Sequence, residues 1–212
     1  MPTSVSILIL HYQGAAMLRD CVASLRPLAA PDVEIVVIDN GSADNVPELL
    51  AGFDFVKCVR SDTNLGFAGG NNFGLNHCTG DHVLLLNDDM ILNADFLAPL
   101  RRYLAEHPKV GAVQGKMLLP RRGNTLDVCG SFLTSLGFPY HYGYFKPDGP
   151  KYSRSHPVFS GKGACLMFRR ELIPQIGGFL FDADFFAYYE EADFCHRVWL
   201  AGYEVQDRKS VV

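Results

Sequence analysis

DHVLLLNDDM, residues 81–90, joins four consecutive apolar residues to three polar ones, two of which are carboxylates. The unbroken apolar run predicts a strand that is buried on both faces of a sheet. Because ligands of open α/β sheets bind at the carboxyl ends of the strands, this strand would bring negative charge to a ligand-binding edge.

Asp88 and Asp89 repel each other unless a cation or a proton neutralises them. Oxygen ligands suit a hard cation, so the pair predicts a site for Mg2+ or Mn2+. The alternative is that Asn87 and Asp88 cap a helix beginning near Asn93, and this stretch alone favours neither interpretation.

Apolar strands and amphipathic helices alternate on both sides of this stretch. We expect strands over residues 5–10, 34–38 and 53–59 before it, with helices between them, and a helix over 94–105 and a strand over 110–119 after it. This alternation predicts an α/β fold, in which crossover helices flank a mostly parallel sheet.

The second half of the chain is less regular. Residues 120–159 carry scattered prolines and aromatic residues, and we interpret them as a long excursion over the sheet edge, with an acceptor surface or core packing as alternative roles for 132–159. A strand over 163–169, a helix over 188–201 and a strand from Tyr203 follow.

Composition narrows the class of protein. The 212 residues are 48% hydrophobic, enough for one sizeable core, and the net charge of -4 argues against a dedicated nucleic-acid binder. No apolar run approaches the roughly 20 residues that span a bilayer, and we see no signal peptide. Six cysteines without a CxxC pair indicate reduced thiols, so we expect a cytoplasmic protein.

Further polar groups are expected at the same edge. Asp39 ends the second strand, although capping of the following helix is the more common use of such a residue. The glycine-rich residues 66–72 could bring backbone N–H groups to a ligand, but they are not a dinucleotide fingerprint. Lys162 stands between two glycines and could touch a phosphate, although a surface turn is the favoured interpretation.

Glu190 and Glu191 form a second acidic centre after four aromatic residues. Acids in a first helical turn are stabilised by the helix dipole, which is the simpler interpretation. Aromatic packing beside a carboxylate also raises its proton affinity, which suits a general base. Neighbouring residues on a helix point in different directions, so at most one of the two should face the ligand edge.

Taken in order, these motifs resemble the GT-A domain of a family 2 glycosyltransferase. The resemblance rests on VSILILHY (5–12), IVVIDNGSAD (35–44), NLGFAGGNN (64–72), LLLNDD (84–89) and YEEADFCHR (189–197) with AGY (201–203). The third motif is similar to the corresponding motif in the branch of this family that contains rhamnosyl- and galactofuranosyl-transferases.

The resemblance implies roles for individual residues. Asp89 would ligate the divalent cation, Mg2+ or Mn2+, while Asn87 replaces the family's usual first Asp. Glu191 would be the catalytic base, with Glu190 as its competitor. The nucleotide would be bound by His11, Tyr12, Asp39, Asp62, Asn64, Gly69 and Asp88.

The resemblance also implies the function. We expect an inverting, metal-assisted hexosyltransferase that moves a sugar from dTDP-rhamnose or a UDP-sugar to a glycan or lipid-linked acceptor, without nucleic acid, at the inner face of a membrane. Residues 1–119 would form the nucleotide-binding half of one GT-A domain and 120–212 the acceptor half. The family's histidine after the strand that follows Tyr203 is absent before Val212, so we expect a C-terminal truncation with weakened metal binding.

Two alternatives stay open. Glu191 and Asn87 stand where the family commonly has Asp, which would suit a binding or regulatory module that lost turnover. A nucleotidyltransferase or another Rossmann-like enzyme is the third hypothesis, although its glycine and lysine signature near the N-terminus is absent.

Overall fold

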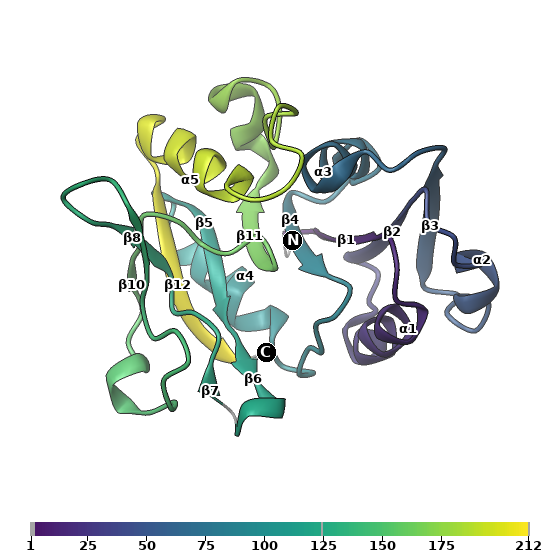
Figure 1. Cartoon of the computed structure of the whole chain (residues 1–212), viewed down its shortest axis with the longest axis horizontal. Helices are drawn as coiled ribbons and strands as arrows, with labels where there is room; N and C mark the ends of the chain where they lie inside the picture. Colours follow the sequence, from purple (N-terminus) through teal and green to yellow (C-terminus); the bar gives the residue numbers. More distant parts are fainter. Residues whose placement is uncertain (1–2, 124, 212) are drawn as a thin grey trace.

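The computed structural model describes residues 3–123 and 125–211. Its main sheet has eight strands in the order β10-β12-β5-β11-β4-β1-β2-β3 (Figure 1). The bounds are β1 (Val5–His11), β2 (Val33–Asn40), β3 (Val56–Ser61), β4 (His82–Asn87), β5 (Val110–Lys116), β10 (His156–Pro157), β11 (Cys165–Arg169) and β12 (Glu204–Val211).

The predicted, mostly parallel sheet is confirmed. Strand β1 runs parallel to both β2 and β4, β2 parallel to β3, and β12 parallel to β5. Strand β11 is antiparallel to β4 and β5, and β10 is antiparallel to β12. Strands from both predicted halves share the sheet, and the functional division at residue 119 stays a prediction.

Helices cover both faces of the sheet. Their bounds are α1 (Ala15–Ser24), α2 (Val46–Leu49), α3 (Gly66–Leu75), α4 (Leu97–Glu106) and α5 (Glu190–Leu200), with 3-10 turns η1 (Arg26–Leu28), η2 (Pro120–Arg122), η3 (Pro150–Tyr152) and η4 (Arg170–Ile176). Figure 1 shows α3 and α5 on one side of the strands and α1 on the other.

Strand β4 is buried on both faces, as its sequence predicts. Leu84 and Leu86 join a core with α1 and α4, whereas Val83 and Leu85 join a second core with α3 and α5. Successive side chains of a strand point to opposite faces, so a continuous apolar run fills both cores.

The predicted glycine-rich turn is shorter than expected, because α3 begins at Gly66. A Cβ at Gly70 would lie 2.5 Å from Leu10 Cδ1, and one at Gly74 would lie 2.5 Å from Leu8 Cδ1. The glycines therefore let α3 pack closely on β1, and Gly69 lies within the helix.

The bounds of other elements also differ from the prediction: β3 begins at Val56, α4 begins at Leu97, and the strand predicted over 110–119 is divided after Lys116.

The excursion has a small fold of its own. Strand β6 (Leu118–Leu119) pairs with β7 (Thr125–Leu126), and β8 (Ser131–Leu133) pairs with β9 (Pro139–His141). Leu126, Cys129 and Tyr152 form its core, whereas Leu136 and Phe138 at the β8–β9 hairpin are 81% and 66% exposed. The aromatic residues are thus divided between packing and surface.

No disulfide joins any of the six cysteines, all of which lie in the described part of the chain, and five of them are buried. Among the residues that the structure describes, no helix is both long and apolar enough to cross a membrane.

Candidate functional site

The carboxyl ends of β1, β2 and β4 meet at one edge of the sheet, which we call the carboxyl edge. His11 lies opposite Asp39 in the register of β1 and β2, and Leu10 lies opposite Asn87 in that of β1 and β4. The parallel pairing predicted from the sequence therefore brings Asp39 and the acids after Asn87 to the same edge.

His11 is fully buried between two carboxylates. Its Nδ1 lies 2.6 Å from Asp88 Oδ2 and its Nε2 lies 3.1 Å from Asp44 Oδ2. Asp44 also accepts a hydrogen bond from the Gly14 backbone N–H at 3.0 Å. Burial alone would lower the pKa of His11, but the hydrogen bonds and charges of Asp88 and then Asp44 outweigh it and raise the pKa above 6.5.

We expect His11→Gln to lose stability mainly at low pH. A histidine whose pKa is raised by folding contributes its stabilisation below the unfolded pKa, near 6.5, and loses it as the pH rises through the folded pKa. Urea unfolding should show a deficit of about 1–3 kcal/mol at about pH 5.5 and a smaller one at about pH 8.5. An equal deficit at both pH values would contradict a charged His11 bridge.

Asp39 is buried and neutralised by Arg60. One carboxylate oxygen accepts from the Ser42 backbone N–H at 2.9 Å, and the other accepts from the Arg60 guanidinium, which also donates to the Ser42 carbonyl at 3.0 Å. The capping alternative is wrong, because α2 begins after Asn45 without a side-chain cap. Asp39 instead holds the turn after β2 beside an arginine.

The other predicted nucleotide residues surround this turn. Asn64 Oδ1 accepts from Asn40 Nδ2 at 3.0 Å and from the Gly66 backbone N–H at 2.9 Å, so it fixes the turn into α3. Asp62 is exposed and Tyr12 is 43% exposed, so both are accessible to a ligand. Their binding of a nucleotide stays a prediction.

Asp89 is exposed at the carboxyl edge, directly after Asp88. Partial removal from water and the charge of Asp88 raise the pKa of Asp89, while the charge of Lys162 opposes the rise. The alternative that Asn87 and Asp88 cap a helix is wrong: α4 begins only at Leu97, without a side-chain cap, and Asp88 is bound by His11.

A divalent cation fits Asp89 only together with a substrate. Among the described residues, no three His, Cys, Asp or Glu side chains are grouped so that they could hold a metal by themselves. Mg2+ is commonly held by one or two protein carboxylates, while substrate phosphates and water supply its other ligands. The single exposed carboxylate of Asp89 meets that requirement.

Glu191 lies in the first turn of α5, after two residues with positive φ, Tyr188 and Tyr189. It packs against Gly163, where an added Cβ would be 3.6 Å from the Glu191 Cβ. Burial raises the pKa of Glu191, and the nearby charges of Lys162 and His141 oppose that rise. A strained backbone before a desolvated carboxylate is typical of a functional site.

Glu190 points elsewhere, as expected for neighbours on a helix. It is 5% exposed, and its Oε2 has no hydrogen-bond partner within the part of the chain that the structure describes. Burial and the charge of Glu191 raise the pKa of Glu190. The charges of Lys162 and His141 are among the causes that act on the pKa of Glu191, but not among those that act on the pKa of Glu190.

Lys162 connects the two acidic centres. Its backbone N–H donates to buried Gln114 Oε1 at 2.7 Å, and its Nζ lies 2.5 Å from Asp127 Oδ2. The charge of the same ammonium group opposes the rise in the pKa of Asp89 and of Glu191. Lys162 is therefore an ion-paired cation whose backbone is held by Gln114, and the interpretation of residues 160–163 as a free surface turn is wrong.

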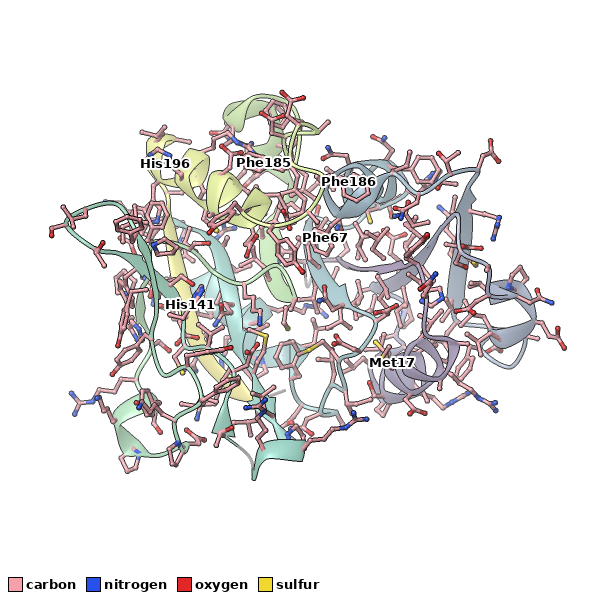
Figure 2. The ribbon with its side chains drawn as sticks, in the orientation of Figure 1. Met17, Phe67, His141, Phe185, Phe186 and His196 are labelled. Atoms are coloured by element: carbon pink, nitrogen blue, oxygen red, sulfur yellow. The ribbon has the colours of Figure 1, made fainter. Side chains whose placement is uncertain are left out.

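Aromatic side chains connect α3 to the loop before α5. Figure 2 shows Phe67 close to Phe185 and Phe186, between these elements. The Phe67 backbone N–H donates to the Phe186 carbonyl at 2.8 Å, and Gly66 has a φ of 72° where a Cβ would lie 2.6 Å from that carbonyl. The loop that leads to Glu191 is thereby fixed to α3.

Sequence reasoning missed several charged residues of this region: Asp44, Arg60 and Asp127. Each acts through a partner far away in the sequence, such as Arg60 with Asp39. The polar turn after β2 was a signal for Asp44, whereas no local pattern marked Arg60 or Asp127.

The two best-defined cavities lie away from the acidic centres. One of about 740 Å3 lies at the opposite edge of the sheet around His82 and Arg170, and one of about 630 Å3 lies beside α1 and α2 around Arg19 and Glu48. We place the candidate site by its converging charged groups, because a diphosphate and a cation need charge more than enclosure.

The fold and the charged carboxyl edge define an α/β protein with a candidate ligand-binding edge. The chain belongs to glycosyl transferase family 2, whose family model matches residues 6–177.

Curated relatives are consistent with that family. The low-salt glycan biosynthesis hexosyltransferase Agl10 of Haloferax volcanii is 27% identical over 206 residues, which are 93% of this chain and 62% of the relative. The poly-beta-1,6-N-acetyl-D-glucosamine synthase of Staphylococcus epidermidis is 30% identical over 134 residues, 61% of this chain and 32% of the relative. The chain thus spans less than two thirds of either protein.

Solved structures share the predicted GT-A fold. The mannosyltransferase PcManGT from Pyrobaculum calidifontis, in complex with GDP-Man and Mn2+, has a TM-score of 0.73 at 20% identity, covering 100% of this chain and 56% of its own. GalNAc-T7 with UDP, GalNAc and Mn2+ has a TM-score of 0.75 at 14% identity, covering 99% and 43%. At these identities the likeness concerns the fold.

Proposed function

We propose that the chain transfers a sugar from a nucleoside-diphosphate sugar to an acceptor hydroxyl, with inversion at the anomeric carbon. The observation that supports this most is that residues 162–164 connect the two acidic centres: Gly163 packs against Glu191, and the Ala164 carbonyl accepts from the Asn87 backbone N–H at 3.0 Å. The carboxyl edge thus offers Asp89 as a ligand for a metal ion, the positively charged side chain of Lys162 and the desolvated carboxylate of Glu191.

Each group has a distinct task in this reaction. Glu191 takes the proton of the acceptor hydroxyl as its oxygen attacks the anomeric carbon, while the bond from that carbon to the diphosphate breaks. Burial raises the pKa of Glu191, which makes it a stronger proton acceptor, and the charge of Lys162 opposes that rise. Lys162 also faces the diphosphate, whose negative charge increases as it departs.

Asp89 would hold Mg2+ or Mn2+, which when bound neutralises the diphosphate oxygens. On the other side of the edge, the Asp39–Arg60 pair and Tyr12 border the place for the base and the ribose. One Asp88 oxygen is bound by His11, so Asp89 is the proposed ligand of the cation.

The acceptor is proposed as a glycan or a lipid-linked glycan. Agl10 is named for glycan biosynthesis, and a Myxococcus xanthus relative with 29% identity is an O-antigen biosynthesis protein. A lipid-linked acceptor would place the reaction at the inner face of a membrane, in agreement with the cytoplasmic location expected from cysteines without a CxxC pair.

Isothermal titration with UDP-, GDP- and dTDP-sugars in the presence of Mn2+ tests the proposal. We expect at least one of these sugar nucleotides to bind, more tightly with Mn2+ than with a chelator. Absence of binding by every member of the panel would contradict it. A dTDP-rhamnose preference would support the rhamnosyltransferase-like branch.

A binding module without turnover is the second candidate, favoured by Asn87 at the position of the usual first Asp. It predicts nucleotide binding without transfer of the sugar. Transfer that Glu191→Gln abolishes would exclude it.

A further inference from the structure

On the basis of the proposed sugar transfer, we propose that His141 binds the acceptor sugar through a hydroxyl next to the one that Glu191 deprotonates. His141 ends β9, in the excursion that no predicted site residue came from. It would make the β8–β9 hairpin an acceptor-recognition element for a neutral glycan.

The base of the hairpin that carries His141 is connected to the segment beside Glu191 by hydrogen bonds of Ser131 and Ser160. Ser131 lies opposite His141 in the hairpin register. The Ser131 backbone N–H donates to the Ser160 carbonyl at 2.8 Å, and the Ser160 N–H donates back at 3.1 Å. The Ser160 hydroxyl donates to the Gly161 carbonyl at 2.8 Å, and its oxygen lies 3.4 Å from the Glu191 carbonyl oxygen. The base of the hairpin is therefore held against the start of α5.

The imidazole of His141 is oriented with one nitrogen free. Its Nδ1 lies 2.8 Å from Ser131 Oγ, and its Nε2 has no hydrogen-bond partner among residues 3–123 and 125–211. The ring is exposed, and Figure 2 shows His141 in the part of the molecule where β10 and β12 lie, whereas His196 lies in the second half of α5. That the charge of His141 affects the pKa of Glu191 agrees with this proximity.

The surroundings suit an uncharged sugar. Residues 128–145 contain no Asp, Glu, Lys or Arg, so the hairpin itself carries no carboxylate, ammonium or guanidinium group, and Arg122 and Lys151 lie over its Phe145 and Tyr142 rings. The Tyr144 ring lies 6.2 Å from the His141 ring and is 49% exposed, which gives an amphipathic aromatic face beside the free nitrogen. Sugar hydroxyls come in neighbouring pairs, so Glu191 and His141 can each engage one.

Two variants of His141 separate binding from structure. His141→Phe keeps the ring but removes the nitrogen, and it should raise the acceptor KM about 3- to 10-fold, which corresponds to one lost hydrogen bond. His141→Gln keeps a terminal amide that can bind a hydroxyl and should restore most of the loss. The probes are octyl glycosides of glucose, galactose and mannose, with the sugar nucleotide that binds in the titration as donor.

Donor titration of His141→Phe and a variant of a second histidine serve as controls. The donor Kd of His141→Phe should equal that of the wild type, and His196→Phe, on the exposed face of α5, should leave the acceptor KM unchanged. If His141→Phe fails to fold, Ser131→Ala, which frees the ring, should raise the acceptor KM about 2- to 5-fold.

An unchanged acceptor KM in His141→Phe, or an equal loss of donor affinity that His141→Gln does not restore, would overturn the role of His141. Transfer by the wild type would still support the proposed function in that case. Absence of transfer by the wild type would count against the proposed function itself.

Discussion

Glu191→Gln should bind the sugar nucleotide as the wild type does and transfer the sugar about 100- to 10,000-fold more slowly, the usual contribution of a general base. The substitution keeps the size and shape of the side chain but removes the proton acceptor. Rapid-quench measurement of kcat together with donor titration separates the two effects.

Glu190→Gln is the matched comparison for this variant. Glu190 is buried and lies apart from the charges of Lys162 and His141, so its replacement should lower kcat far less than that of Glu191. A larger loss in Glu190→Gln would assign the base to Glu190. Turnover at the wild-type rate in Glu191→Gln would remove the base from this edge altogether.

Asp89→Asn should lower kcat/KM about 100-fold or more and remove the dependence of donor binding on Mn2+. A bound divalent cation contributes several kcal/mol of charge stabilisation when a diphosphate departs, and each 1.4 kcal/mol corresponds to a factor of ten. Titration of the nucleoside diphosphate with and without Mn2+ gives a readout that does not depend on turnover.

Asp95→Asn is the control for Asp89→Asn, since Asp95 is exposed on the same loop after β4. It should bind nucleotide and Mn2+ as the wild type does. If Asp89→Asn kept the Mn2+ dependence of nucleotide binding, the cation would have to be held by other groups.

Much of the edge could be predicted from the sequence because it depends on local patterns. The four apolar residues before Asn87 determine that β4 is buried on both faces, so the acids that follow must emerge at its carboxyl end. The helical geometry of α5 likewise requires that Glu190 and Glu191 diverge, and the structure separates them.

The parts that could not be predicted depend on contacts between distant residues. Arg60 and Asp39 are brought together only by the pairing of β2 with β3, and Lys162 meets Asp127 only through the excursion. The glycines of residues 66–72 resembled a flexible turn because their sequence does not reveal that Leu8 and Leu10 press against the helix.

His141 illustrates the same limit. Its position beside Glu191 follows from the Ser131–Ser160 bridge, which joins the excursion to the segment before β11. Nothing in the irregular aromatic pattern of residues 132–159 marks one histidine over another.

A crystal structure of the chain with Mn2+ and the nucleoside diphosphate that it binds tests the central claim most directly. The account predicts the diphosphate between Asp89 and Glu191, with Mn2+ on the Asp89 carboxylate and the Lys162 ammonium facing a phosphate oxygen. Nucleotide and Mn2+ bound at another edge of the sheet, away from both carboxylates, would contradict it.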